Sequence, residues 1–479
     1  MNAYVGIDVG TTNTKILVIT KKGIDKIYKL QTVKKKIDDV EFFDVDSIEK
    51  AVRKTLKTIR KSYRIVGIAC TSVGESVVPV ASGKKLYDPI VWYDTCTKFL
   101  YEEYHDLVNR LAPYRISGSR DIYYYSLYKI LYMQRKDLVD LHEVECWLPI
   151  SSYIAYRLTG NAVWDMTQAY RSHMVDIHRR CWNEELLKAF NIRIEQLGKL
   201  DYTSSFVGYH DDIPIFLAGH DHLTGTFGLI SLFGGELIYD SMGTASYTVA
   251  VATEKTNEFH MEGPFMKTGG NVGIAFQDRQ YYLASGMRFY GKLIEMTLKL
   301  FSLKFSSKRF ERLNESISQT PTDPAFYIYA NGDNIVGEDI DGINFVQIPP
   351  DCSQEQMLQS VYLYLCYTSR ITVENLRRLL GKLPIVVGGA LVQNQVFMKY
   401  KASMLGEPLY YLNTTELTAL GAAIAAITGV KDEETLNSLR EKITFQRIEP
   451  HPQDVLRMNG LYERMTEQYE KILQRRGGQ

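Results

Sequence analysis

The sequence predicts an α/β protein with two domains of similar topology that face each other across a cleft. One observation is a repeated unit, in which an apolar strand ends in Asp, turns through Gly-Thr and continues as a second apolar strand, at residues 4–19 and again at residues 236–251. The other is the alternation of short apolar strands with helical stretches along the chain. Because a repeated unit indicates repeated topology, we place the boundary before the second copy, with domains at residues 1–235 and 236–479.

The composition narrows the classes of partner. Among 479 residues, 45% are hydrophobic and 56 basic residues balance 56 acidic ones, so no net field attracts nucleic acid or an anionic membrane. No apolar run approaches the roughly 20 residues of a membrane span, and no signal peptide precedes the first strand-like stretch. We expect a cytoplasmic protein with a small-molecule partner, and the oligomeric state, a homodimer included, stays open.

The first half has individually recognisable elements. The strands around the turn at residues 10–14 and a third apolar run at residues 27–30 predict an antiparallel meander, and the lysines at 34–36 predict a solvated loop. A strand at residues 65–69 and a helix at residues 126–134 follow. Six widely spaced cysteines without a CxxC pair indicate free thiols rather than a zinc site or disulfides.

The second half of the chain also contains recognisable helix signals. Ser353 and Gln356 have the spacing of a capping box before apolar residues at helical spacing. Residues 416–426 predict a helix with a face of small residues, which indicates close helix packing, and residues 461–472 predict an amphipathic closing helix.

The first Gly-Thr turn is a candidate phosphate site. Backbone N–H groups and hydroxyls can surround phosphate oxygens, and this turn offers them from Gly10, Thr11, Thr12, Asn13 and Thr14. Asp8, at the end of the preceding strand, is suited to Mg²⁺, which takes carboxylate, water and phosphate ligands, and Lys15 can neutralise a terminal phosphate. Taken alone, such a turn is more often just a hairpin.

A second copy of the pattern, at Gly243 and Thr244, favours a phosphate site over a merely structural hairpin. Two such turns that face one cleft can contact both ends of a triphosphate. Further on, an apolar strand at residues 385–387 runs into Gly388 and Gly389, where a flat adenine ring could approach the backbone closely. Asn394 begins the next helix and completes the predicted nucleoside site.

Asp221 is the candidate general base. It follows an apolar run from Ile213 and stands in a Gly-His-Asp-His sequence before a small-residue helix. Phosphoryl transfer to an alcohol uses a residue, usually Asp, that orients the hydroxyl and accepts its proton. The alternative is a helix N-cap. His220 and His222, two residues apart without a third ligand, do not indicate zinc.

These motifs together resemble the FGGY family of carbohydrate kinases, within the actin and Hsp70-like ATPase superfamily. Residues 6–12 are similar to the family's first phosphate motif and residues 240–244 to its second. Gly219-His220-Asp221 falls at the catalytic Asp, and residues 388–389 with 416–423 resemble the adenosine motif and a family signature. The resemblance implies two actin-like (ribonuclease H-like) domains with an interdomain active-site cleft, and the cofactors ATP and Mg²⁺.

The resemblance also implies a substrate site on the first domain. The family's sugar contacts map to Glu75, Trp92 and Asp94, beside Asp221, whereas core packing and a turn are the alternatives for Trp92 and Asp94. The sequence differs from the family pattern at three positions, which leaves the identity of the sugar undetermined. Cys96 occupies a position where relatives commonly have Arg, Tyr132 replaces a Trp, and Ser403 replaces an Asp.

The expected function is transfer of the γ-phosphoryl group of ATP to a hydroxyl of a sugar, preferably a ketose such as a pentulose, or a polyol. A chaperone-type ATPase is one alternative, because the first turn is also similar to that of Hsp70 proteins. The present sequence argues against this alternative, because its second phosphate turn contains no Gly-Gly-Gly-Thr stretch. A sugar-binding regulator that has lost catalysis is the other alternative, and Asp8 and Asp221 argue against it.

Overall fold

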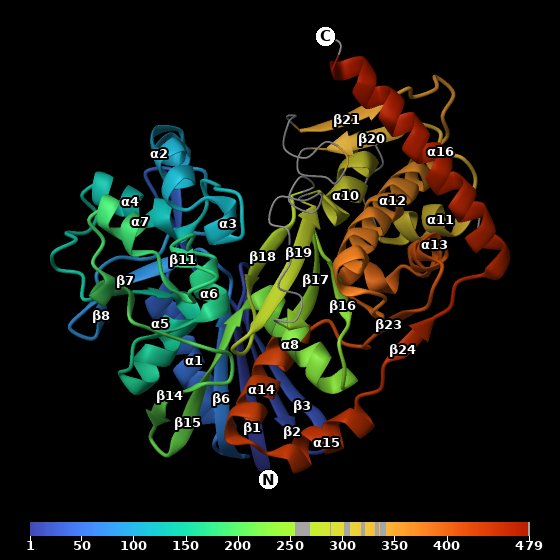
Figure 1. Ribbon diagram of the computed structural model, residues 1–479. Helices are drawn as coiled ribbons and strands as arrows, with labels where there is room; N and C mark the ends of the chain where they lie inside the picture. Colours follow the sequence, from blue (N-terminus) through green and yellow to red (C-terminus); the bar gives the residue numbers. More distant parts are fainter. Residues whose placement is uncertain are drawn as a thin grey trace.

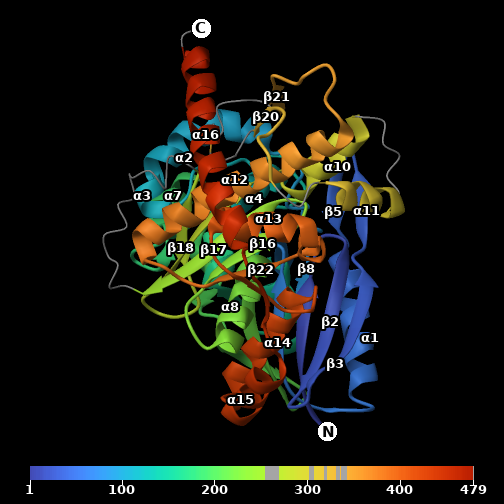
Figure 2. The ribbon, with the colours of Figure 1, turned by 90° about the vertical axis from the view of Figure 1, so that its right-hand side faces the viewer.

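The computed structural model describes residues 1–253, 269–287, 289–300, 307–317, 321–330, 335 and 342–477. Each half of the chain forms a large mixed sheet, and two helices lie between the sheets (Figure 1). These helices are α8 (Asp221–Phe233) and α14 (Leu417–Val430). Figure 2 shows them side by side, with the N-terminus at one end of the molecule and the C-terminus at the other.

The first sheet has the order β14-β15-β6-β1-β2-β3. Its strands are β14 (Phe206–His210), β15 (Ile213–His220), β6 (Arg64–Ser72), β1 (Asn2–Val9), β2 (Asn13–Thr20) and β3 (Gly23–Gln31). The pairs β1–β2 and β2–β3 are antiparallel, as predicted for the meander, whereas β1–β6 and β6–β15 are parallel. The carboxyl ends of β1, β6 and β15 therefore meet at one edge.

Helices cover both faces of this sheet. α1 (Val45–Ile59) and α5 (Ile150–Thr159) lie on one face, and α14 packs on β1, β2, β6 and β15 from the other. The smaller elements of this half are α2 (Lys98–Leu111), α3 (Tyr114–Ser117), α4 (Ser126–Arg135), α6 (Met166–Tyr170), α7 (Glu184–Ala189), β4 (Lys34–Ile37), β5 (Val40–Phe43), β7 (Val77–Ala81), β8 (Lys84–Lys85), β9 (Cys146–Pro149), β10 (Val163–Asp165), β11 (Val175–Asp176), β12 (Cys181–Trp182) and β13 (Lys199–Asp201).

The second sheet has the order β18-β19-β17-β16-β22-β23-β24. Its strands are β18 (Asn271–Ile274), β19 (Gln280–Met287), β17 (Ser246–Thr253), β16 (Ile238–Met242), β22 (Ile385–Gly388), β23 (Leu409–Tyr411) and β24 (Gln446–Ile448). The antiparallel β16–β17 hairpin next to parallel β22 repeats the arrangement of β1, β2 and β6. This correspondence is the two-domain, actin-like α/β architecture.

The remaining helices lie around the second sheet, except α15, which contacts α8 and α14 beside the first sheet (Figure 1). α8 contacts β16 and β17 on its inner face, and α12 contacts β17 from the outer side. The elements are α10 (Gly291–Leu300), α11 (Ser307–Ser316), α12 (Gln354–Leu380), α13 (Gln395–Leu405), α15 (Glu433–Lys442), α16 (Pro452–Gly477), β20 (Tyr327–Ala330) and β21 (Ile343–Val346). No helix among the described residues is long and apolar enough to cross a membrane. The boundary at residue 235 remains a prediction.

Most predicted elements appear at their expected places, including the capping box at Ser353 and the closing helix, whose residues 461, 465, 469 and 472 are buried. The loop predicted at the lysines 34–36 is wrong, because β4 and β5 form an antiparallel ribbon there. The turn between them, Asp38-Asp39, has positive φ at both residues. That geometry closes a two-residue hairpin, and Asp tolerates it.

Candidate active site

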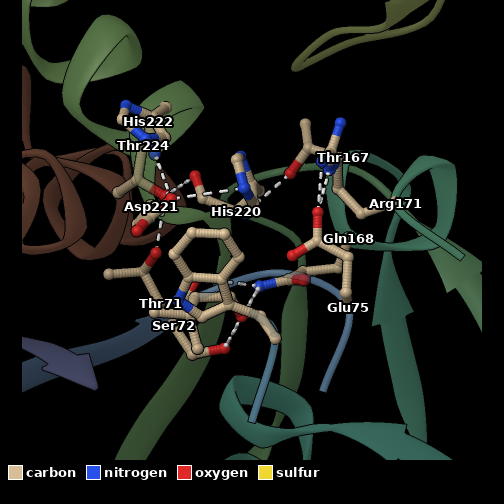
Figure 3. Close-up of polar contacts among 12 residues, drawn as sticks. Thr71, Ser72, Glu75, Thr167, Gln168, Arg171, His220, Asp221, His222 and Thr224 are labelled. Carbon is tan, nitrogen blue, oxygen red and sulfur yellow. Dashed lines mark hydrogen bonds and ion pairs between the residues drawn. The ribbon is translucent and has the colours of Figure 1, made fainter. Parts of the chain in front are cut away.

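The ends of three parallel strands bring the predicted chemistry together. Asp8 on β1 pairs in register with Thr71 on β6, and Gly219 on β15 pairs with Thr71 from the other side. Asp221, two residues beyond, therefore lies near the segment that carries Glu75 (Figure 3). Residues far apart in sequence thus meet at one edge of the first sheet.

Asp221 is the first residue of α8, and the N-cap is His220, whose side chain makes no capping hydrogen bond. Asp221 Oδ1 accepts the backbone N–H of His222 at 2.7 Å and lies 3.2 Å from His220 Nε2. One quarter of the Asp221 side chain is exposed. The structure therefore does not give Asp221 the N-cap position that was its alternative role.

The surroundings of Asp221 keep it ionised. Burial by itself would raise its pKa, but His222, His220, the backbone N–H of His222 and Arg171 together lower the pKa below its ordinary value. Burial also lowers the pKa of His220 to about 4, so this imidazole is neutral near pH 7. A carboxylate beside a neutral imidazole can accept a hydrogen bond from a substrate hydroxyl.

A hydrogen-bonded support holds the chain before Asp221. Gly219 has φ of 86°, and a Cβ on it would lie 2.2 Å from Thr167 Oγ1. That hydroxyl accepts the backbone N–H of His220 at 2.9 Å. Gln168 Nε2 donates to the carbonyls of Ser72 and Gly219, joining the ends of β6 and β15. The corner that presents Asp221 is therefore fixed from two sides and requires glycine at 219.

Asp8 belongs to a cluster of opposite charges. Lys15 Nζ lies 4.0 Å from Asp8 Oδ2 and 2.6 Å from Glu416 Oε2, a residue of the second half that sequence reasoning did not single out. Burial raises the pKa of Asp8 to about 7, and Asp221 and Glu416 add to the rise while Lys15 opposes it. An additional cation at this edge would therefore be stabilised by Asp8.

The first turn is closed by its own contacts. Gly10 N–H donates to Asn13 O at 3.1 Å, and Thr11 Oγ1 accepts the indole N–H of Trp92 at 2.9 Å. Thr14, part of the predicted phosphate site, is buried, and its hydroxyl shares a hydrogen bond with Thr32. Thr12 is exposed, and Gly10, Thr11 and Asn13 are partly exposed, so the hydroxyls of the turn that solvent reaches belong to Thr11 and Thr12.

Glu75 lies in a buried ion pair. Arg171 Nε donates to Glu75 Oε1 at 2.6 Å, and the guanidinium stacks over the rings of Tyr124 and Tyr125. Glu75 is 4% exposed and has φ of 60°. A residue other than glycine in this left-handed conformation is strained, and such strain concentrates at functional sites. Lys129, fully buried nearby, donates to the carbonyls of Trp92 and Tyr124.

Trp92 and Asp94 differ in what they offer a ligand. The Trp92 side chain is 37% exposed and joins the predicted sugar wall to the first phosphate turn through Thr11. The two oxygens of Asp94 accept the backbone N–H groups of Glu41 and Cys96, each at 2.9 Å. These contacts match the turn role that was the alternative for Asp94, and sugar binding by Asp94 stays a prediction.

The second turn lies at the corresponding edge of the second sheet. Ser241 pairs in register with Gly388, which places Gly243 and Gly389 at one end of β16 and β22. A Cβ on Gly389 would lie 2.3 Å from Met242 O, so close backbone packing already requires this glycine. Asn394 caps α13 by accepting the N–H of Phe397, and its amide donates to Tyr362.

Arg171 and Glu416 are the residues that sequence reasoning missed. Arg171 stands in no motif, and its ion pair with Glu75 spans 96 positions. Glu416 had a signal, an acid directly before the small-residue helix, but its partner Lys15 lies in the other half of the chain. Local spacing cannot reveal either pair.

Comparison with known proteins agrees with this geometry. The model of the FGGY carbohydrate kinase N-terminal domain matches residues 3–228, and that of the C-terminal domain matches residues 239–430. Relatives by sequence include glycerol kinase 1 of Thermotoga maritima, 24% identical over 483 residues that cover 94% of this chain and 96% of the relative. L-fuculokinase of Escherichia coli strain K12 is 23% identical over 489 residues, covering 93% and 96%.

Solved structures share the fold over almost the whole chain. The ligand-bound xylulose kinase from Lactobacillus acidophilus superposes with a TM-score of 0.83 at 17% identity, covering 99% of both chains. Plasmodium falciparum glycerol kinase with ADP has a TM-score of 0.81 at 19% identity, covering 98% of both. The family match decides against the chaperone-type ATPase, and the chain belongs to the FGGY family of carbohydrate kinases, phosphotransferases with an alcohol group as acceptor.

Proposed function

We propose that the protein transfers the γ-phosphoryl group of ATP to a hydroxyl of an uncharged ketose, such as a pentulose, or of a polyol, with Asp221 as general base. The observation that carries the proposal is the state of Asp221, which is ionised, partly exposed and held at the end of β15. Among the described residues, its hydrogen bond from the His222 N–H and its contact with the neutral His220 imidazole both fall on Oδ1. Oδ2 then accepts the proton of the attacking hydroxyl.

A carboxylate of low pKa suits this reaction. In phosphoryl transfer the loose transition state demands positioning more than a strong base. The Gly219 corner and the His222 N–H restrict Asp221 to one orientation, which lowers the entropic cost of alignment. Asp221 therefore orients the hydroxyl and receives its proton as the bond to phosphorus forms.

The residues near the turns fit Mg²⁺ and ATP. Among the described residues, no group of three or more His, Cys, Asp and Glu side chains could hold a metal ion. A single carboxylate suits Mg²⁺, which keeps several waters and takes its other ligands from phosphates. Asp8 would hold the ion, which would neutralise phosphate charge. Gly10, Thr11, Thr12, Asn13 and Lys15 would bind phosphates beside Gly243 and Thr244, with Gly388, Gly389 and Asn394 near the nucleoside.

The charge balance favours a neutral acceptor. Glu75 and Arg171 neutralise each other within the predicted sugar site, and Lys129 donates to backbone carbonyls. A sugar acid would bring a carboxylate that neither Arg171 nor Lys129, the described cations of this site, is free to neutralise. The relatives named glycerol kinase and L-fuculokinase support the same class of acceptor.

A panel of acceptors tests the proposal. Glycerol, other alditols, ketoses, aldoses and gluconate are offered with ATP and Mg²⁺, and ADP release is followed by a coupled assay. We expect one neutral acceptor to raise ADP release strongly, because closure around the acceptor completes the site. An acceptor that binds calorimetrically without ADP release would instead indicate the inactive regulator.

Asp221→Asn tests the base. The substitution keeps the shape and the hydrogen bond to His222 while removing the proton acceptor, so kcat falls by about 10² to 10⁴. Nucleotide and acceptor binding, measured by calorimetry on the same preparation, stays near the wild-type value. Asp212→Asn, an exposed acid before β15, serves as the matched control. Near-normal phosphorylation by Asp221→Asn would remove Asp221 from the mechanism.

A further inference from the structure

A buried ion pair lies beneath the second Gly-Thr turn. Lys401 on α13 and Asp240 on β16 have side chains that are 0% and 1% exposed, with 2.5 Å between Nζ and Oδ2. Asp240 stands three residues before the turn glycine Gly243, whereas Asp8 stands two residues before Gly10 and faces the edge near Asp221 and Glu416. The second Asp is directed inward to a lysine.

The ammonium group of Lys401 joins several elements. It donates to the Tyr290 hydroxyl at 3.0 Å, to the Ser369 hydroxyl at 2.9 Å and to Met242 Sδ at 3.3 Å. Burial by itself would lower the pKa of Lys401, but Asp240 and Tyr290 raise it above its ordinary value, so the group is charged. One cation therefore connects β16, α12 and the residue before α10.

Two of these contacts continue directly into the turn. Met242 is the residue before Gly243. Tyr290 N–H donates to Thr244 O, Gly291 N–H to Gly243 O and Lys292 N–H to Thr244 O, each at 3.1 Å. The backbone of the turn is thus held by residues 290–292, and residue 290 is held by Lys401.

We infer that Lys401 is a positioning residue for the second phosphate turn, fixing Gly243 and Thr244 through Asp240 and Tyr290 so that the turn meets the nucleotide phosphates. The inference rests on the proposed function, since it takes this turn as part of the ATP site. It predicts that loss of the ion pair weakens nucleotide binding and leaves acceptor binding unchanged, because the acceptor residues lie on the first sheet.

A charge-free replacement separates positioning from stability. In Asp240→Leu/Lys401→Met, apolar side chains take the place of both charges, an exchange that buried pairs often tolerate without loss of stability. We expect a cooperative thermal transition, a rise of about tenfold in the KM for ATP and in the Kd for ADP, and a change of less than about twofold in the acceptor KM. The ADP measurement by calorimetry is independent of turnover.

A control variant and a milder variant complete the test. Arg377→Met/Glu407→Gln removes another ion pair of the second half that does not contact the turn, and it should leave ADP affinity unchanged. Tyr290→Phe keeps the ring and removes the hydroxyl that Lys401 contacts, and it should weaken ADP binding by about threefold.

Unchanged ADP affinity in a folded double variant or in Tyr290→Phe would overturn the inference, as would an equal loss in the Arg377/Glu407 control. A wild-type protein that binds no nucleotide would instead overturn the proposed function on which the inference rests.

Discussion

Glu75 combines backbone strain with burial of a charge, two conditions that cost stability unless they serve a purpose. Its φ of 60° and its ion pair with Arg171 restrict the carboxylate of this residue, which lies three positions beyond the end of β6. Preceding Gly74 lies against the ring of His220, so the segment of Glu75 packs on the corner that presents Asp221. The packing therefore links the proposed acceptor residue Glu75 with the corner that presents Asp221.

Glu75→Gln should raise the acceptor KM and leave the ATP KM unchanged. Glutamine keeps the size and the backbone conformation, but it loses the charge that fixes Arg171 and a strong acceptor for a sugar hydroxyl. A lost contact of this kind costs about 1 to 3 kcal/mol, which corresponds to roughly 5- to 150-fold in KM. Steady-state kinetics with both substrates varied provide the measurement, and a parallel rise in the ATP KM would place Glu75 outside the acceptor site.

The residues that sequence could identify share one property, a local pattern. Asp8 lies near the end of an apolar strand, Asp221 directly follows one, and Gly219 precedes a His-Asp pair, so the local sequence alone predicted that they lie at strand ends. Lys401 and Glu416 act through partners 161 and 401 positions away, Asp240 and Lys15. A single sequence carries no information about which distant charges meet, because tertiary packing decides it.

At the level of elements, α8 and α14 approach each other through glycines. A Cβ on Gly228 would lie 2.6 Å from Gly421 Cα, and a Cβ on Gly421 would lie 2.0 Å from Thr224 O. Thr224 is one helical turn after Asp221, and its hydroxyl donates to the carbonyls of Ala218 and His220. The contact between the two helices therefore affects the first turn of α8, which carries the proposed base Asp221.

Gly421→Ala should destabilise the protein and lower kcat, although alanine favours helix. The gain in helix propensity is about 1 kcal/mol, whereas overpacking against the backbone of α8 costs about 1 to 3 kcal/mol, so we expect a net loss. Urea unfolding and kcat with the best acceptor give both readouts. Gly460→Ala in α16 meets only the end of the Arg464 side chain and should be neutral or stabilising. Unchanged kcat in Gly421→Ala would separate this contact from catalysis.

The small-residue pattern at residues 416–426 predicted a closely packed helix, and this is confirmed by α14. Its partners were not predictable, because the same small-residue face could pack on any helix or sheet. The strand at residues 34–36 was not predicted, because a charged strand in a two-stranded ribbon lacks the apolar alternation that marks a half-buried strand. Elements with a clear apolar pattern were predicted, whereas the charged ribbon of β4 and β5 and the packing partners of α14 were not.

For the whole molecule, buried neutral histidines make stability depend on pH. Burial, with Arg171 adding to it, lowers the pKa of His173 to about 3, from an ordinary value of 6.5. His173 stacks on Tyr125, and its Nε2 lies 3.8 Å from Asp121 Oδ1, whose pKa is raised by burial to about 6. Below pH 6.5 the unfolded chain binds a proton at His173 that the folded chain rejects, so this contribution falls as the pH falls.

His173→Asn removes that titration, and Asn tolerates the positive φ of this position. The stability of the wild type relative to the variant should decrease by about 2 kcal/mol between pH 7 and pH 5, because the unfolded-state pKa lies 1.5 above the lower pH. Urea unfolding of both proteins at each pH measures the difference between their free energies of unfolding. The titration of Asp121 occurs in both proteins and largely cancels in this difference. A difference that is independent of pH would show that His173 is protonated in the folded protein.

The position of α14 has a consequence for biosynthesis. Tyr4 in β1 donates its hydroxyl to Asp432, 428 residues later, and α14 covers a face of the sheet that β1 begins. At about 5 to 20 residues per second, a ribosome completes the strands of this sheet and then needs roughly ten seconds or more to supply the helix that covers them. During that interval an apolar sheet surface is open to other chains. Chaperone capacity and translation speed over the second half of the message should therefore control the yield of soluble protein.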